Sequence, residues 1–432
     1  MNEPASFRMR AAAIVVAAGL VGTGVLVATQ LNTVPNQNSA PHAIVELPEF
    51  SGSKQIMGGS FYDTPKIKIG EQAPGSLIRS ERIADAPPGI TAYRLMYTSQ
   101  TAAGVDNAVT AVYAVRSGPP PTPNGRPIVA VAHGTTGIAP GCGISQAPFT
   151  PGSTGFGTWE QIMSGLVGAG FAVVATDYAN LGPTATPDYL VQDGEAHDVL
   201  NSVRAVKKLD PATVDGSNIG IIGHSQGGHS ALSAAYDSDA YAPDVAIKGT
   251  VALAPAIFPP APVLIKFLET GRDKPDAAFM AFISDVVNSW VANYPDEFQM
   301  DQLYTEKGIA AAQVALTGCL SASAEAFDAP KKEFMPPTLP NSILGIAAKN
   351  FPIWDKYPVP ILIQQGLKDT TVVPGINLAA ARTFCRQGST VALQTYPEDV
   401  HSSLLYTGAP EAISWLQDRF ADKPAPSDCG GL

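Results

Sequence analysis

The sequence has 432 residues, of which 45% are hydrophobic and 15% are charged. A chain of this length and balance can bury a stable core in one large domain or two medium ones, which excludes a mini-protein and a mainly disordered chain. The formal net charge is -11 at pH 7, and the Lys and Arg residues are scattered along the sequence. Because the summed charge repels phosphate backbones, we expect no nucleic-acid partner.

The N-terminus has the order of a secretory signal. Arg8 and Arg10 precede an uncharged run over residues 11–29, and a polar, Pro-containing stretch over residues 30–41 follows. The apolar run is also just long enough to cross a bilayer, so an uncleaved N-terminal membrane anchor is the alternative. We assign residues 1–40 to this signal or anchor with its linker, and we expect a protein that is secreted or held at the cell envelope.

The segment after the signal predicts an irregular region and then a hairpin. Residues 42–88 are rich in Pro, Gly and short polar stretches, and we expect them to form an irregular wrap over the core. Apolar and polar residues alternate over 91–99 and again over 108–117, with Gly104 between the two runs. This pattern is typical of two antiparallel strands joined by a turn.

Beyond the hairpin, predicted strands alternate with predicted helices. The unbroken apolar run 127–132 is typical of a strand that is buried on both faces. Further strands are predicted at 171–176, 219–222, 249–254, 359–364 and 391–396, and helices at 159–167, 195–209, from 226 onward, 376–386 and 410–420. The alternation predicts an α/β fold, a mostly parallel sheet with helices on both faces.

The alternation stops after residue 254. Residues 257–350 have the pattern of helical pieces broken by Pro, and we expect them to form a helical cap inserted into the sheet domain. The predicted core then has two parts, residues 41–256 and residues 351–432.

The candidate nucleophile lies in a G-x-S-x-G pattern, Gly-His-Ser-Gln-Gly at 223–227, between a predicted strand and a predicted helix. A sharp turn in this setting holds the serine in a strained conformation above the sheet. The residues that follow are small, as close packing of that helix requires: Gly228, Ser230, Ala231, Ser233, Ala234 and Ala235. We therefore predict that Ser225 is a nucleophile rather than an ordinary serine in a Gly-rich turn.

A serine hydroxyl needs an imidazole base, and the base needs a carboxylate to orient it. This fold places the three in the order Ser, acid, His. His401 is the histidine that follows both Ser225 and a plausible acid, and it comes just after the last predicted strand. We prefer Asp369, at the end of the preceding strand, as the acid. Glu398 and Asp399 are the alternatives, but they lie too close to His401 in sequence to reach the far side of its ring.

The oxyanion of an acyl-transfer intermediate needs preorganised N–H donors. One predicted donor is the backbone N–H of Gln226. The other lies in the loop 133–137, His-Gly-Thr-Thr-Gly, which follows the first buried strand. We favour the N–H of Thr135, with Thr136 as the alternative.

Other polar residues are weaker candidates. Asp177 and Tyr178 could line the pocket, although a strand-end Asp more often caps a turn. His197 and Asp198 are expected at the surface or in helix packing, and Trp290 is expected to be a packing residue that could touch an apolar substrate.

The cysteines point to disulfides and not to a metal. Four cysteines in an exported chain predict two disulfides, with three pairings possible: Cys142, Cys319, Cys385 and Cys429. Their wide spacing and the lack of a C-x-x-C pattern argue against a metal site. The predicted serine chemistry needs no cofactor.

With these motifs the chain resembles the secretory lipase family, the lipase A type of α/β-hydrolase known from fungi and actinobacteria. The resemblance rests on H-G-T-T-G at 133–137, G-H-S-Q-G at 223–227, G-L-K-D-T at 366–370, V-H-S at 400–402, the long helical insertion and the four cysteines. It implies the α/β-hydrolase fold, with a cap over an acyl-binding tunnel. It also implies that Cys142 pairs with Cys319 and that Cys385 pairs with Cys429.

We expect an exported serine ester hydrolase, a lipase or carboxylesterase that acts on acylglycerols or other acyl esters through an acyl-enzyme. Its cap is expected to contact a lipid interface. One alternative is an acyltransferase that uses the same three residues with an alcohol acceptor. A less favoured alternative is a non-catalytic binding protein on a hydrolase fold.

Overall fold

The computed structural model describes residues 59–63, 69–257, 270–338, 342–350 and 355–432. The predicted signal or anchor run, residues 11–29, lies outside the described residues, as do 258–269 and 339–341 of the predicted cap. Every described element belongs to one compact unit within residues 47–432. No helix in the described ranges combines the length and the apolar character needed to cross a membrane.

The described part of the chain has a central sheet of nine strands in the order β1-β2-β3-β5-β4-β6-β7-β8-β9. The strands are β1 (Leu77–Arg82), β2 (Ile90–Gln100), β3 (Asp106–Arg116), β4 (Arg126–Ala132), β5 (Ala172–Thr176), β6 (Val214–His224), β7 (Ile247–Leu253), β8 (Ile361–Gly366) and β9 (Val391–Tyr396). Strands β1, β2 and β3 pair in antiparallel fashion, as does β3 with β5. All remaining pairs are parallel, which confirms the predicted mostly parallel sheet.

The parallel strands are buried on both faces, as their unbroken apolar sequences predict. Every residue of β5 and of β8 is buried, and Ile128 to Ala132 in β4 are at most 2% exposed. The predicted hairpin is also present, because β2 pairs with β3 from Ile90 opposite Arg116 to Gln100 opposite Asp106. Its turn includes Gly104 with a φ of 75°, a conformation that favours glycine.

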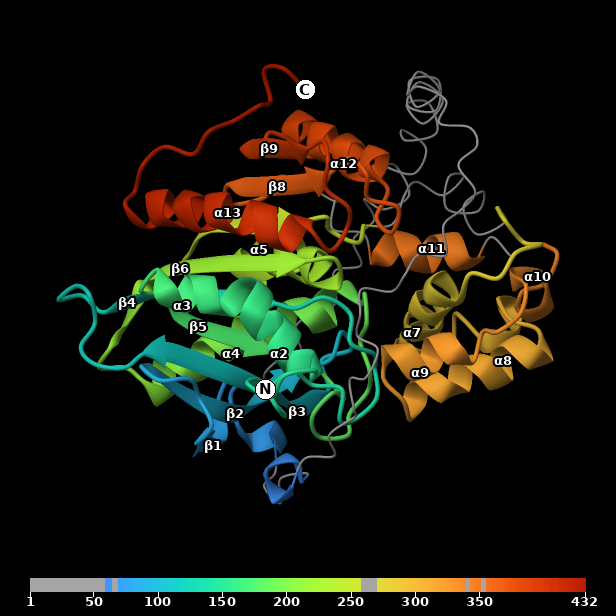
Figure 1. The fold of residues 1–432 in the computed structure, drawn as a ribbon, viewed down its shortest axis with the longest axis horizontal. Coiled ribbons are helices and arrows are strands. Elements are labelled where there is room, and N and C mark those ends of the chain that lie inside the picture. The colour runs from blue at the N-terminus through green and yellow to red at the C-terminus, as the bar shows by residue number, and fades with distance from the viewer. Residues whose placement is uncertain (1–58, 64–68, 258–269, 339–341, 351–354) are drawn as a thin grey trace, which may run out of the picture. The chain divides into compact units, whose positions relative to one another are not determined.

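Helices cover both faces of the sheet (Figure 1). One face carries α4 (Gln192–Leu209), α5 (Gln226–Tyr241) and α12 (Pro374–Arg386). The other carries α2 (Thr154–Thr158), α3 (Ser164–Gly168) and α13 (Leu404–Phe420). The result is the three-layer arrangement that alternating strands and helices predict.

Between β7 and β8 the described residues form helices and no sheet strand. These helices are α7 (Ala277–Asn293), α8 (Glu306–Ala312), α9 (Leu320–Glu325), α10 (Lys331–Phe334) and α11 (Ser342–Lys349), and we call them the cap helices. They contribute to a hydrophobic cluster that includes Trp290, Phe327 and Phe334, together with Leu190 and Val191 from the segment before α4. In Figure 1 the arrowheads of β6 and β8 point toward the side where the cap helices lie. The limits of the cap, residues 257 and 350, remain a prediction.

Two disulfides are present, Cys142–Cys319 and Cys385–Cys429. These are the pairs that the family resemblance implies. The first joins the loop after β4 to the start of α9, and the second joins α12 to the C-terminal tail.

Three sequence expectations about elements differ from the structure. The predicted irregular wrap contains an edge strand, β1, which pairs with β2. Its sequence, Leu-Ile-Arg-Ser-Glu-Arg, lacks clear alternation because only one of its edges is paired and half of its residues are exposed. The helix predicted to start near residue 410 begins at Leu404, so Pro410 lies inside it.

Tertiary contacts of the first turn explain why α13 tolerates Pro410. Leu404 and Leu405 are buried, and the Thr407 hydroxyl donates a hydrogen bond of 2.7 Å to Asp399. The carbonyl of Gly408 accepts a hydrogen bond of 3.1 Å from Gln364 in β8. These contacts offset the loss of one helical hydrogen bond, which costs about 3 kcal/mol in an isolated helix.

The helix predicted at 159–167 is also longer than expected. It begins at Thr154, where the Ser153 hydroxyl caps it by accepting a hydrogen bond from the Phe156 N–H. It continues through a π-helical turn, Trp159–Met163, into α3.

Candidate active site

The candidate site lies where the parallel strands end. Ser225 follows β6, Asp369 follows β8, His401 follows β9, and the loop 133–137 follows β4. Because the carboxyl ends of parallel strands share one edge of the sheet, the fold brings these four segments to the same side.

Ser225 adopts a strained backbone conformation at the turn between β6 and α5. Its φ of 59° and ψ of -119° are unfavourable for a residue with a Cβ atom. Three hydrogen bonds hold it there. Its N–H donates to the carbonyl of Leu253 (3.0 Å), and its carbonyl accepts from the N–H groups of Ala256 (2.9 Å) and His229 (3.1 Å). The side chain therefore projects from a turn that the surrounding backbone fixes.

The two glycines of the motif are required by close backbone contacts. A Cβ atom on Gly223 would lie 1.9 Å from the carbonyl oxygen of Gly227. One on Gly227 would lie 1.8 Å from the carbonyl oxygen of Ala132, at the end of β4. The turn can therefore lie against the neighbouring strand only when both positions lack a side chain.

His401 is oriented by Asp369. The His401 Nδ1–H donates to Asp369 Oδ2 at 2.7 Å. The other carboxylate oxygen, Oδ1, accepts the backbone N–H groups of Thr371 (2.9 Å) and Val372 (2.8 Å), and Asp369 is only 4% exposed. A carboxylate fixed in this way keeps the proton of His401 on Nδ1, so the lone pair of Nε2 is available as a base.

The alternative acids do not contact the His401 ring. Asp399 instead accepts hydrogen bonds from the hydroxyls of Ser403 and Thr407, both at 2.7 Å. Glu398 forms an exposed ion pair with Lys368. Of the three acids considered from the sequence, the structure thus places Asp369 against His401.

His224 is a contact that the sequence reasoning missed. Its Nε2 lies 2.9 Å from the carbonyl oxygen of His401, and since a carbonyl only accepts, Nε2 carries the proton. The two imidazole rings are 4.4 Å apart. Burial, and then repulsion from His401, hold the pKa of His224 well below its usual value, so it stays neutral when His401 is protonated. Its position directly before Ser225 was the only sequence signal for this role.

The loop 133–137 lies against the turn that carries Ser225. A Cβ atom on Gly134 would lie 3.4 Å from His224 Nδ1 and 3.8 Å from the Ser225 Cβ. The hydroxyl of Thr135 forms a hydrogen bond of 2.8 Å with the hydroxyl of Tyr189. The carbonyl of Thr136 accepts the N–H of Leu320 (3.0 Å), so α9 holds this loop from the far side.

The two predicted oxyanion donors have free N–H groups. Within the described ranges, neither the backbone N–H of Thr135 nor that of Gln226 has a hydrogen-bond acceptor. Gln226 is the first residue of α5, where N–H groups have no partner in the helix and the helix dipole favours negative charge. Both groups are therefore available to an anion formed beside Ser225.

The weaker candidates have structural roles. Asp177 is fully buried and accepts hydrogen bonds from the Thr110 hydroxyl (2.6 Å) and the Ser145 N–H (2.8 Å), and burial raises its pKa. The Tyr178 hydroxyl donates to the carbonyl of His133 at 3.0 Å. Trp290 is 2% exposed and packs edge-on against an aromatic neighbour, Phe298, as a packing residue does.

Of the two positions expected for Asp198, at the surface or in helix packing, the structure shows a buried one in α4. It is fully buried, and its carboxylate accepts hydrogen bonds from the Ser99 hydroxyl (2.6 Å) and the Ala179 N–H (2.8 Å). Burial raises its pKa to about 7. His197 beside it is 9% exposed and stacks on Tyr241, which is helix packing.

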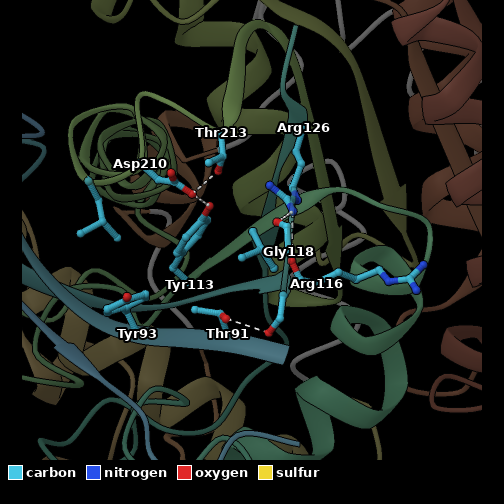
Figure 2. Close-up of a pocket in the computed structure, with 11 residues that line it drawn as sticks. Thr91, Tyr93, Tyr113, Arg116, Gly118, Arg126, Asp210 and Thr213 are labelled. Carbon is cyan, nitrogen blue, oxygen red and sulfur yellow. Dashed lines mark hydrogen bonds between the residues drawn. The ribbon is translucent and has the colours of Figure 1, made fainter. Parts of the chain in front are cut away.

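A surface pocket of about 280 Å³ lies at the other edge of the sheet and does not contain these groups (Figure 2). Arg126, which lines it, is the first residue of β4, whereas the candidate site follows the last residue of that strand. The Arg126 Nη2 donates to three backbone carbonyls, those of Arg116 (3.0 Å), Gly118 (2.6 Å) and Pro119 (3.0 Å). Its guanidinium thus holds the turn after β3, and none of the candidate catalytic residues lines this pocket.

Comparisons with known proteins agree with this architecture. A family profile described as secretory lipase matches residues 153–334 and 345–428. The chain is 24% identical over 407 residues to Lipase 10 of Candida albicans. The aligned region covers 86% of this chain and 82% of that relative.

Solved structures show the same fold. The chain is similar to Candida antarctica lipase A in its closed state, with a TM-score of 0.69 and 19% identity over 85% of this chain and 89% of that one. It is also similar to the rice cell wall degrading esterase LipA from Xanthomonas oryzae, with a TM-score of 0.64 and 18% identity over 81% and 99% of the two chains. These likenesses confirm the predicted α/β-hydrolase fold.

Proposed function

The chain belongs to the secretory lipase family and is a carboxylic ester hydrolase, and we propose that it uses Ser225 as nucleophile, His401 as base and Asp369 as acid. The observation that carries this assignment is the 2.7 Å hydrogen bond between His401 Nδ1 and Asp369 Oδ2. It orients the imidazole that we propose as the base for Ser225, which lies at the strained turn after β6. The free N–H groups of Thr135 and Gln226 support it as an oxyanion hole.

In the proposed first step, His401 Nε2 takes the proton of the Ser225 hydroxyl while Oγ attacks the ester carbonyl carbon. The carbonyl oxygen becomes an oxyanion and accepts hydrogen bonds from the N–H groups of Thr135 and Gln226. His401 then gives its proton to the departing alcohol, which leaves Ser225 acylated. Asp369 stays ionised and stabilises the imidazolium throughout.

In the second step, water replaces the alcohol. His401 takes a proton from the water as its oxygen attacks the acyl carbon, and the same two N–H groups bind the new oxyanion. Collapse breaks the bond to Ser225 Oγ, which regains its proton from His401. The products are a carboxylic acid and the free enzyme.

We propose acyl esters with medium or long chains, acylglycerols among them, as the substrates. The apolar cluster of the cap helices supports this, because an apolar cover shields such a chain from water. Exposed apolar side chains on the segments that carry Asp369 and His401 support contact with a lipid surface: Leu367, Val373, Val400 and Tyr406. We further propose that residues 1–40 direct export, in keeping with the secretory character of the family.

The test is hydrolysis of p-nitrophenyl esters from acetate to palmitate by the purified protein, Ser225→Ala and Ser238→Ala. Ser238 is a buried serine at the other end of α5 whose hydroxyl donates to the carbonyl of Ala235, so it is the matched control. We expect Ser225→Ala to fall to background and Ser238→Ala to keep full activity. Residual hydrolysis by folded Ser225→Ala above background would contradict the assignment.

A further inference from the structure

A buried carboxylate outside the catalytic groups, Glu195 in α4, collects four hydrogen bonds. Its Oε1 accepts from the side-chain amide of Gln226 (2.8 Å) and the N–H of Leu190 (2.9 Å). Its Oε2 accepts from His229 Nδ1 (2.7 Å) and the Ser230 hydroxyl (2.8 Å). Gln226, His229 and Ser230 all lie in the first turns of α5, directly after Ser225. One carboxylate therefore holds the start of this helix by three of its side chains.

His229 links these contacts to Asn350, the residue that follows the cap helix α11. Its Nε2 lies 3.0 Å from the carbonyl oxygen of Asn350 and must donate to it. Its Nδ1 lies 2.7 Å from Glu195 Oε2, and neither side chain has exposed surface. Removal of one partner from a buried polar pair is costly because the other partner is left unpaired.

Asn350, the residue after α11, joins the cap helices to the core. Its side-chain oxygen accepts from the hydroxyl of Tyr294 at the end of α7 (2.9 Å) and from the N–H of Gln192 in α4 (3.1 Å). Its side-chain nitrogen donates to the carbonyl of Ile346 in α11 (3.0 Å). Hydrogen bonds thus run without interruption from Tyr294 through Asn350, His229 and Glu195 to Gln226. We call these five residues the Glu195 network.

We propose that the Glu195 network couples the seating of the cap helices to the alignment of the oxyanion donor at Gln226. This inference rests on the proposed function. The Gln226 N–H can stabilise an oxyanion only at hydrogen-bond distance, and a misplacement of about 1 Å can lower the rate by about a hundredfold. A shift of Asn350 with the cap helices changes the position of His229, and through Glu195 the first turn of α5. Glu195, His229, Asn350 and Tyr294 are positioning residues, because none of them reaches the reacting atoms.

The first experiment compares Tyr294→Phe with Tyr304→Phe. Tyr294→Phe removes only the hydroxyl at the cap end of the network. Tyr304 is a buried tyrosine among the cap helices whose hydroxyl has no partner in the described ranges, so Tyr304→Phe is the matched control. We expect Tyr294→Phe to lower kcat on p-nitrophenyl esters by about threefold to tenfold with KM unchanged, and Tyr304→Phe to keep both values. A wild-type kcat in Tyr294→Phe would overturn the coupling.

The second experiment uses Glu195→Gln, which keeps the shape of the side chain and removes its charge. We expect kcat to fall by about tenfold to a hundredfold, and phosphonylation of Ser225 by a phosphonate ester, with loss of its alcohol, to slow by a similar factor. The double variant with Tyr294→Phe should be no slower than Glu195→Gln alone, because both changes interrupt one path. Fully multiplicative losses would overturn the proposal, as would a lowered melting temperature with kcat intact.

The outcomes separate the network from the proposed function. If the wild type hydrolyses the esters and the variants match it, the network proposal fails alone. If the wild type is inert on every ester and unreactive toward the phosphonate, the proposed function itself fails and takes the network proposal with it. Should Glu195→Gln not fold, the comparison of Tyr294→Phe with Tyr304→Phe still decides.

Discussion

His224 takes no part in the proposed proton transfers, but it contacts His401, the proposed base. It donates to the carbonyl of His401 from a position fixed by the adjacent Ser225. We expect His224→Ala to lower kcat/KM by about tenfold, because the His401 loop loses its link to the nucleophile turn. His224→Gln should retain more activity, since its amide N–H can also donate. Assays of both variants with one ester, in parallel with melting curves, would expose a general folding defect, and equal activities in Ala and Gln would refute the donor role.

Asp285 in α7 makes stability depend on pH. It is fully buried, and within the described ranges neither of its carboxyl oxygens has a hydrogen-bond partner. Burial raises its pKa well above the ordinary value. As pH rises above about 4, the unfolded chain releases this proton while the folded chain keeps it, so stability falls until the raised pKa is reached.

Asp285→Asn should remove this contribution, which is about 1.4 kcal/mol per pH unit in that window. We expect the free energy of unfolding of the variant, measured with urea, to fall less with rising pH above about pH 4 than that of the wild type. Asp273→Asn is the control, because that carboxylate is exposed and paired with Lys332. Parallel pH curves for Asp285→Asn and the wild type would contradict the expectation.

At the scale of elements, the turn from β6 into α5 has no room for a side chain at its two glycines. In Gly227→Ala, the new Cβ would lie 1.8 Å from the carbonyl oxygen of Ala132, so β4 or α5 must move. We expect a loss of several kcal/mol of stability and no hydrolysis, as seen by circular dichroism melting and ester assay. Gly168→Ala in α3 is the matched control, because its Cβ would meet nothing within 4 Å. A Gly227→Ala protein with wild-type stability would show that the turn and β4 can separate enough to admit a methyl group.

The elements that sequence could predict are those with local signals. The run 127–132 predicts β4 because a strand buried on both faces needs apolar residues throughout, and the turn at Ser225 is predicted by its two glycines. The edge strand β1 was missed because pairing on one side imposes little pattern on its residues. The predicted start of α13 is wrong because proline is expected near the beginning of a helix. The burial of Leu404 and the hydrogen bond of Thr407, which stabilise the earlier start, are tertiary contacts and leave no local pattern.

The site divides in the same way. The order Ser225, Asp369, His401 follows from the fold and could be predicted. Glu195 could not, since its partners Gln226 and His229 lie 31 and 34 residues away and a charged residue in a helix usually faces solvent. Nothing local distinguishes a buried carboxylate from an exposed one until the tertiary structure brings its donors together.

For the molecule as a whole, the two disulfides should have different effects. Replacing Cys385 and Cys429 by Ser opens a loop with a separation of 44 residues, which should cost roughly 4 kcal/mol of stability on the chain-entropy estimate. Since this bond ties only the tail to α12, we expect kcat to be unchanged below the melting temperature.

Replacing Cys142 and Cys319 by Ser opens a separation of 177 residues and should cost roughly 5 kcal/mol. This bond also holds α9 beside the loop 133–137, where Gly137 pairs with Cys319. We therefore expect a lower kcat in addition to lower stability. Urea unfolding and ester hydrolysis on both double variants would check this contrast, and an unchanged kcat in the second variant would show that the disulfide does not support the oxyanion loop.

The bond between Cys142 and Cys319 also makes the enzyme depend on the redox state of the compartment it is in. Thiols in the cytosol are kept reduced, so this link forms only after the chain has left it. A newly made molecule beside the membranes of its own cell would lack the tie between its cap and its oxyanion loop. Full hydrolytic activity is therefore expected only in an oxidising compartment outside the cytosol.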